Sequence, residues 1–263
     1  MHTFKGCHAL ITGASSGIGR ELARQLAPEA ATLLLVARRQ DRLEALKNEL
    51  AHPGLTVLSY AVDLADDAQT DAFLTALGQS GRRVDFLINN AGLGDHGLFE
   101  ESEWNRVKAM LDLNIKALTR LTHALLPGLV RSGRGAILNV SSIAGLLPLP
   151  KMAVYAATKA YVTSFSEALR AELRGTGVSV TALCPGPIET EFFEIAGRPN
   201  ANEKAPAPEF FKVPVEQVAR EALDAVIRDR ARVIPGWLVC FVMTITTLVP
   251  IFLLRVFIAP GRR

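Results

Sequence analysis

Cysteine is scarce in this chain of 263 residues, which has only Cys7, Cys184 and Cys240. The three lie far apart, with no Cys-x-x-Cys pair and no cluster of cysteine and histidine. This spacing argues against a disulfide framework and against a metal site. We therefore expect no bound metal and a reducing compartment, the cytoplasm. The first apolar run begins within a few residues of the N-terminus and leaves no room for a signal peptide.

An excess of charge of either sign is also missing, because 29 Lys and Arg oppose 26 Asp and Glu for a net charge of +3. The sequence has no basic block, so a nucleic-acid partner is not expected. Internal repeats, low-complexity tracts and Pro/Gly/Ser-rich linkers are absent as well. With 49% hydrophobic and 21% charged residues, the composition is typical of a folded protein with a sizeable core.

What the sequence does have is a regular alternation of short apolar runs and amphipathic stretches. Strands followed by helices in this order predict parallel strands joined by right-handed crossovers. We expect an α/β fold, with one doubly wound, Rossmann-type parallel sheet of about seven strands in a single domain over residues 1–236. The expected strands are 8–12, 32–37, 56–62, 84–90, 135–141, 178–184 and 231–235, and the main expected helices are 18–27, 41–51, 70–79, 103–129, 154–174 and 215–229.

The stretch TGASSGIG, residues 12–19, joins the first expected strand to the first expected helix. Glycine is favoured where a backbone turns with positive φ or where another group approaches closely. A strand entering such a turn and a helix leaving it would point free N–H groups at one place, where a phosphate can bind. By itself, the glycine pattern is also compatible with a connection that binds nothing.

Four more stretches follow strand ends or lie on the helices after them: NNAG (89–92), Asn114, NVSSIAG (139–145) and YAATK (155–159). In their order and spacing, together with TGxxxGxG, they resemble the short-chain dehydrogenase/reductase family over most of the chain. The resemblance implies a nicotinamide cofactor and the interconversion of a carbonyl compound and an alcohol as small-molecule substrates. The cofactor-binding positions that it implies are Gly13, Ser15, Ser16, Gly17, Ile18, Gly19, Asp63, Leu64, Asn90, Ala91, Gly92, Tyr155, Lys159, Pro185, Gly186, Ile188 and Thr190.

The end of the second expected strand points to NADP(H) rather than NAD(H). Ala37 stands where an acidic residue would hold both ribose hydroxyls of NAD. Arg38 and Arg39 follow, and a guanidinium suits a 2′-phosphate through two parallel hydrogen bonds. The alternative is that both arginines are ordinary surface residues.

Tyr155 and Lys159 stand four apart on an expected helix, so their side chains share one face. A neighbouring ammonium is expected to lower the phenol pKa toward the working range of an acid–base catalyst. Ser142 would donate a hydrogen bond to the substrate oxygen, and Ser141 is its rival, expected to point back to the sheet. By resemblance, Lys159 also binds the nicotinamide ribose, and Asn114 holds a water that relays protons. Each residue alone could have a purely structural role.

The substrate is not determined by these motifs. The segment of about 190–213 is expected to form a lid, and its paired phenylalanines at 192–193 and 210–211 favour an apolar substrate or anchor the lid to the core. Gly94, His96 and residues 146–149 are expected on the opposite wall. Two other interpretations of the whole chain stay open: a catalytically idle NADP(H)-binding regulator, and a membrane-tethered interaction module.

The C-terminal tail, 237–263, has no charged residue between Trp237 and Leu254, a length close to that needed to span a bilayer. Pro250 and Arg255 argue against a span. Attachment to a membrane surface, a contact with another subunit and a true span all remain open. By resemblance, the two longest expected helices pair with their copies across a two-fold axis, so a homodimer or homotetramer is expected.

Overall fold

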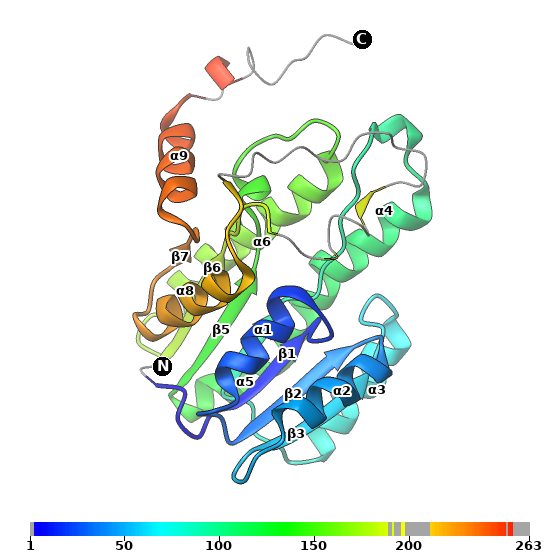
Figure 1. Ribbon diagram of the computed structural model, residues 1–263, viewed down its shortest axis with the longest axis vertical. Helices are drawn as coiled ribbons and strands as arrows, with labels where there is room; N and C mark the ends of the chain where they lie inside the picture. The colour runs from blue at the N-terminus through cyan, green and yellow to red at the C-terminus, as the bar shows by residue number, and fades with distance from the viewer. Residues whose placement is uncertain (1–2, 189–190, 192–195, 198–210, 251, 255–263) are drawn as a thin grey trace.

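The computed structural model describes residues 3–188, 191, 196–197, 211–250 and 252–254. Seven parallel strands form one sheet in the order β3-β2-β1-β4-β5-β6-β7 (Figure 1). The chain runs outward from β1 to β3 and then returns to place β4 on the other side of β1, as the doubly wound prediction requires. The bounds of the seven strands are β1 His8–Thr12, β2 Thr32–Ala37, β3 Thr56–Ala61, β4 Phe86–Asn89, β5 Gly135–Val140, β6 Val178–Leu183 and β7 Arg232–Val233.

The central strands are buried on both faces, which explains why they read as continuous apolar runs. Ile11 of β1 lies between Leu35 of β2 and Ile88 of β4 in register. All three side chains are fully buried. Successive side chains along each strand point to opposite faces of the sheet. They therefore contribute to two separate apolar layers, one on each face.

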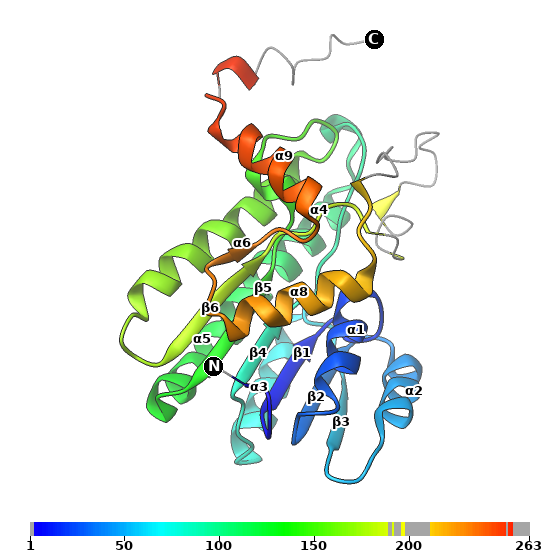
Figure 2. The same cartoon turned by 60° about the vertical axis from the view of Figure 1, so that its left-hand side comes forward.

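Helices cover both faces of the sheet (Figures 1 and 2). The apolar layer on one face contains residues of α1 (Gly17–Leu26), α2 (Gln40–Leu50) and α8 (Val215–Ile227). The layer on the other face contains residues of α3 (Asp67–Gln79), α5 (Leu118–Ser132) and α6 (Ala153–Glu172). The short helices are α4 (Trp104–Leu111) and the 3₁₀ turns η1 (Phe99–Glu101) and η3 (Ile143–Leu146).

Two predicted elements differ from the structure. The stretch 103–129 is not one α-helix, because a π-helical segment, η2 (Asp112–Ala117), separates α4 from α5. Strand β7 has only two residues instead of the predicted 231–235. Pro235 has no N–H to donate to a neighbouring strand, and Gly236, at φ +82°, turns the chain into the next helix.

That last helix, α9 (Trp237–Leu248), lies at the end of the sheet where the strands finish (Figure 2). One side of α9 is buried through Val239 and Met243, which belong to the core. The other side exposes Trp237, Phe241 and Leu248, which are 81%, 59% and 77% exposed. Among the described residues, no helix has both the length and the apolar character needed to cross a membrane.

Candidate active site and cofactor cradle

The turn between β1 and α1 is as crowded as its glycines predict. Gly13 and Gly17 adopt φ values of +65° and +54°, in the left-handed region that favours glycine. A Cβ atom on Gly19 would lie 2.5 Å from the carbonyl oxygen of Gly13, so a side chain there would displace the turn. A bound group can therefore approach the backbone of this turn closely only because these three positions are glycine.

The loop after β4 holds this turn from behind. Asn90 donates from its side-chain amide to the carbonyl oxygens of Thr12 and Gly13, at 2.8 and 3.2 Å. In return, the Thr12 hydroxyl accepts from the backbone N–H groups of Asn90 and Ala91, both at 2.9 Å. Asn90 was expected to bind the cofactor, and its side-chain contacts show that it braces the glycine turn.

The start of α1 leaves room for an anion. Ser16 occupies the position before the helix, but its side chain makes no capping hydrogen bond, and the first turn of the helix carries no acidic residue. The hydroxyls of Ser15 and Ser16 instead accept from the guanidinium of Arg39, at 3.3 and 3.0 Å. Uncapped N–H groups at a helix start carry partial positive charge, so the pyrophosphate of a dinucleotide fits this cradle.

Three polar side chains, Ser142, Tyr155 and Lys159, line the same cavity as the glycine turn. Tyr155 and Lys159 come from the buried side of α6 and are 7% and 4% exposed. Ser142 lies two residues after β5, directly before η3, and hydrogen-bonds to Tyr155. The Lys159 ammonium donates to the carbonyl oxygen of Val140 at 2.8 Å and lies 5.8 Å from the centre of the Tyr155 ring. The structure thus brings together the predicted Ser, Tyr and Lys.

The two neighbouring serines have different surroundings. The Ser141 hydroxyl is buried against α6, where it donates to the carbonyl oxygen of Lys159 at 2.8 Å and lies 2.7 Å from the Thr163 hydroxyl. The Ser142 hydroxyl accepts from the backbone N–H of Ala144 at 3.1 Å and faces Tyr155. Both residues line the cavity, and of the two hydroxyls it is that of Ser142 that hydrogen-bonds to Tyr155.

Burial dominates the protonation of this cluster. Burial raises the pKa of Tyr155 to about 12, although the hydrogen bond with Ser142 lowers it in part. Burial also lowers the pKa of Lys159 to about 8, against a smaller opposing effect of the Cys184 thiol. The expected net lowering of the phenol pKa toward the working range is therefore wrong for this arrangement, because desolvation is the largest influence on Tyr155 and the Lys159 ammonium points toward the carbonyl oxygen of Val140. At neutral pH, Tyr155 holds its proton and can donate it.

Asn114 explains the π-helical segment. Its amide oxygen accepts from the backbone N–H of Leu93 at 2.8 Å, and its amide nitrogen donates to the Leu93 carbonyl oxygen at 2.9 Å and to the Thr158 hydroxyl at 3.0 Å. The residue is 1% exposed. A wider helical turn of this kind often occurs at functional sites. Here it directs a buried amide toward the loop that follows β4.

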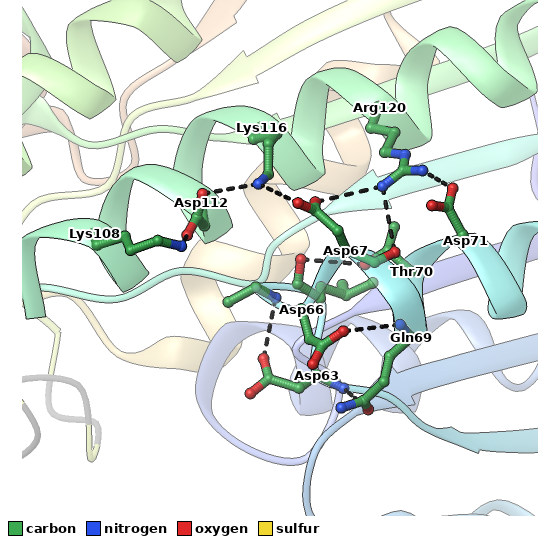
Figure 3. A network of polar contacts seen from close by, with 12 residues as sticks. Asp63, Asp66, Asp67, Gln69, Thr70, Asp71, Lys108, Asp112, Lys116 and Arg120 are labelled. Carbon is green, nitrogen blue, oxygen red and sulfur yellow. Dashed lines mark hydrogen bonds and ion pairs between the residues drawn. The ribbon is translucent and has the colours of Figure 1, made fainter. Parts of the chain in front are cut away.

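The loop after β3 lines the cavity with Asp63 and Leu64 and is fixed by polar contacts. Asp63 accepts from the backbone N–H of Ala65 at 3.0 Å, and the Thr70 hydroxyl donates to the Leu64 carbonyl oxygen at 3.2 Å. Figure 3 shows how the network continues beyond this loop, with Lys116 lying between Asp67 of α3 and Asp112 of η2. The network thus links the segment after β3 to the helical segment that carries Asn114.

One cavity of about 650 Å³ joins the glycine turn to the Tyr155 cluster. Gly19 and Asn114 are not among its lining residues and support it from behind, through Gly13 and Leu93. Thr190, like most of the predicted lid, lies outside the described residues. The predicted site residues that line the cavity are Gly13, Ser15, Ser16, Gly17, Ile18, Arg38, Arg39, Asp63, Leu64, Asn90, Ala91, Gly92, Ser142, Tyr155, Lys159, Pro185, Gly186 and Ile188.

Residues 7–200 match a family model described as short chain dehydrogenase. The chain belongs to the short-chain dehydrogenase/reductase family. It is similar to a sulfoacetaldehyde reductase of Chromohalobacter salexigens, at 47% identity over 189 residues, which cover 69% of this chain and 72% of the relative. This short-chain dehydrogenase is therefore an oxidoreductase of a family that uses a nicotinamide cofactor.

Two solved structures are similar to this short-chain dehydrogenase over almost its whole length. One is a short-chain dehydrogenase from Sphingobium yanoikuyae in complex with NADPH, with a TM-score of 0.82, 32% identity, and coverage of 98% of this chain and 96% of that chain. The other is a family member from Burkholderia phymatum in complex with NAD, with a TM-score of 0.82, 26% identity, and coverage of 100% and 99%. The family resemblance alone therefore does not decide between the two cofactors.

Several residues of this short-chain dehydrogenase's cavity were not predicted. From α9, Val239, Val242 and Met243 form one wall. The tail is so uniformly apolar that no inward side stood out in the sequence. Glu191 also lines the cavity and pairs with Arg39 and with Arg42, which lies one helical turn after Arg39. The spacing of the two arginines was a usable signal, but nothing marked Glu191.

Proposed function

We propose that this chain is an NADP(H)-dependent oxidoreductase that interconverts a carbonyl compound and a secondary or primary alcohol. The observation that carries the proposal is that Ser142, Tyr155 and Lys159 share one cavity with the glycine turn. Bound NADP(H) supplies or accepts the hydride. The chain's own residues bind the substrate oxygen and move its proton.

In the direction of reduction, Tyr155 donates its phenolic proton to the carbonyl oxygen as negative charge develops there. Its high pKa keeps the proton in place until that oxygen becomes basic. Ser142 donates a second hydrogen bond to the same oxygen. The Lys159 ammonium donates to the Val140 carbonyl oxygen and lies 5.8 Å from the centre of the Tyr155 ring. Its positive charge stabilises the phenolate that remains after Tyr155 has given up its proton.

The preference for NADP(H) rests on charge at the end of β2. Ala37 leaves no carboxylate there, and the Arg39 guanidinium lies against the hydroxyls of the glycine turn. Arg38 is exposed, lines the same cavity and makes no ion pair with the part of the chain that the structure describes. A 2′-phosphate near these groups would gain charge-assisted hydrogen bonds that NAD(H) cannot make. The NADPH-bound relative agrees with this choice.

An apolar substrate is proposed from the walls around Tyr155. Leu149 and Met152 line one part of the cavity, and Phe211, Val239 and Met243 line another. Gly94, His96 and Leu147, which were expected on the wall opposite the lid, also line the cavity, whereas Leu146 and Pro148 do not. The relative from Chromohalobacter salexigens is by its name a reductase of sulfoacetaldehyde, an anionic aldehyde. This chain's mostly apolar walls favour uncharged ketones and aldehydes instead.

The test is NADPH oxidation against a panel of apolar ketones and aldehydes with sulfoacetaldehyde included, comparing wild type, Tyr155→Phe and Tyr161→Phe. We expect turnover of apolar carbonyls by wild type, a loss of about 10²- to 10⁴-fold in Tyr155→Phe, and unchanged NADPH affinity. Tyr161 lies on the same helix, is 37% exposed and serves as the control.

Near-normal turnover by Tyr155→Phe would contradict the catalytic assignment. Tight NADPH binding by wild type without turnover of any carbonyl would instead favour the idle regulator. A clear preference for sulfoacetaldehyde would contradict the apolar substrate and leave the reaction class intact.

A further inference from the structure

Three charged side chains meet between the start of α2 and the chain after β6: Arg39 and Glu191, which line the cavity, and Arg42, which does not. The carboxylate of Glu191 accepts from the guanidinium of Arg39 at 3.0 Å and from that of Arg42 at 2.6 Å. The three side chains are 36% to 41% exposed. The two guanidiniums hold the pKa of Glu191 below its usual range, so the carboxylate is ionised at neutral pH.

Arg39 is held from two directions. One of its terminal nitrogens contacts Glu191, and the other contacts the hydroxyls of Ser15 and Ser16 in the glycine turn. In folds of this type, the residue that contacts the adenosine ribose lies at the end of the second strand. The anion that Arg39 and Arg42 hold in this structure is therefore a carboxylate of the chain itself, at the edge of the region where a ribose 2′-phosphate would lie.

A carboxylate and a phosphate present the same kind of oxygen pair to a guanidinium. They cannot share the two arginines closely without repulsion between like charges. An ion pair this exposed is weak, because solvent screens it, so a phosphate can displace it. A cofactor without the 2′-phosphate has no need to displace it.

We propose that Glu191 competes with the 2′-phosphate of the cofactor for Arg39 and Arg42. This competition lowers the affinity of the enzyme for NADP(H) and so reduces the ratio of its affinities for NADP(H) and NAD(H). The proposal rests on the proposed function, because it assumes that the dinucleotide occupies the glycine cradle. It adds a specificity-determining residue that reaches the adenosine end from a distant part of the chain.

The test uses two fragments that differ only in the phosphate, 2′,5′-ADP and 5′-AMP, titrated by calorimetry into the full chain. Wild type is compared with Glu191→Gln, which keeps the shape and removes the charge. Glu167→Gln is the matched control, because Glu167 pairs with Arg232 at 2.8 Å, has a similarly exposed side chain and is not a lining residue of the cavity.

Glu191→Gln is expected to bind 2′,5′-ADP about three- to fivefold more tightly, as the loss of one exposed ion pair allows, and to leave 5′-AMP affinity unchanged. Glu167→Gln should change neither affinity. Unchanged or weaker binding of 2′,5′-ADP by Glu191→Gln would overturn the proposal, because Glu191 would then be neutral or would position the arginines. Weaker binding of 5′-AMP would also overturn it, since Glu191 would then hold the ribose hydroxyls.

The two proposals fail in different ways. The preference for NADP(H) is judged on wild type, by the ratio of its affinities for the two fragments. The competition is judged on the change of that ratio in Glu191→Gln. If wild type shows no preference and the variant gains one, competition is supported while the NADP(H) preference of the natural chain fails. If neither protein shows a preference, both proposals are overturned.

Discussion

Arg39 is the residue on which the choice of cofactor depends most directly. Its guanidinium links the glycine turn to the end of β2, where the last strand residue is Ala37 rather than an acidic residue. Arg39→Gln is expected to weaken NADPH binding by about 10- to 100-fold, the loss typical of charge-assisted hydrogen bonds. NADH binding should change far less. Fluorescence titration of both cofactors measures this, and equal losses for the two would show that Arg39 supports only the turn.

Lys159 makes stability depend on pH. Burial lowers its pKa to about 8 in the folded chain, from an ordinary value of 10.5. Between these values, the unfolded chain binds more protons than the folded one, so the free energy of unfolding rises as pH rises. From pH 7.5 to 10, urea unfolding should show wild type gaining about 2 kcal/mol relative to Lys159→Met. Tyr155 remains in both proteins, and its raised pKa acts mainly above pH 10.

A constant difference between wild type and Lys159→Met across this range would contradict the buried, easily deprotonated lysine. A difference that shrinks as pH rises would mean that the ammonium gains a partner on folding. Either outcome would also contradict the inference that burial, rather than pairing with a charged group, determines the pKa values in the Tyr155 cluster.

At the scale of elements, the π-helical segment η2 depends on Asn114. Asn114→Ala removes the side-chain partners of both backbone polar groups of Leu93, and should lower the free energy of unfolding by about 1–3 kcal/mol for each group left unsatisfied and buried. Asn105→Ala is the control, on the exposed side of α4. Chemical denaturation measures the free energy of unfolding of both variants. Equal, small losses of stability would show that helix packing alone maintains η2.

The strands were predictable because their apolar runs are short and buried on both faces. The interruption at Asn114 was not, since a π-helical turn keeps the amphipathic pattern of its neighbours and differs only in its hydrogen bonds. β7 was overestimated because ARVIP reads as a strand, although Pro235 cannot continue the pairing.

The site was predictable where residues share a short motif. Gly13, Ser142, Tyr155 and Lys159 stand at fixed spacings along the chain, and the fold brings them into one cavity. Glu191 was not predictable, because its partner Arg42 lies 149 residues away in the sequence. Pairings at that distance follow from the strand order and loop paths, which a single sequence does not display.

At the scale of the whole molecule, the outward side of α9 is expected to be covered, either by a membrane surface or by another subunit. Phe241→Ser with Leu248→Ser replaces two of the three large apolar side chains named on this side, and leaves Trp237 in place and Val239 and Met243 in the core. The homodimer or homotetramer remains a prediction. Substitution is a cleaner test than deletion from Trp237, because deletion would also remove one wall of the cavity.

Two measurements apply to this double variant: sedimentation with phospholipid vesicles and mass by light scattering. Loss of vesicle binding at constant mass identifies a membrane contact, and a smaller mass without vesicle binding by wild type identifies a subunit contact. Phe241→Leu with Leu248→Ile keeps the apolar surface and should behave as wild type. If the serine variant also behaves as wild type in both measurements, the outward side of α9 is not a contact surface.

The position of α9 in the chain also sets the order in which the cavity can form during synthesis. A ribosome releases the glycine turn before the Tyr155 cluster, and the wall at Val239 and Met243 emerges after both. Domains commonly begin to fold from the N-terminal side as they are made. A nascent chain would thus hold a cradle for the nucleotide well before its catalytic pocket is closed, and a dinucleotide could act as a template for the last stage of folding.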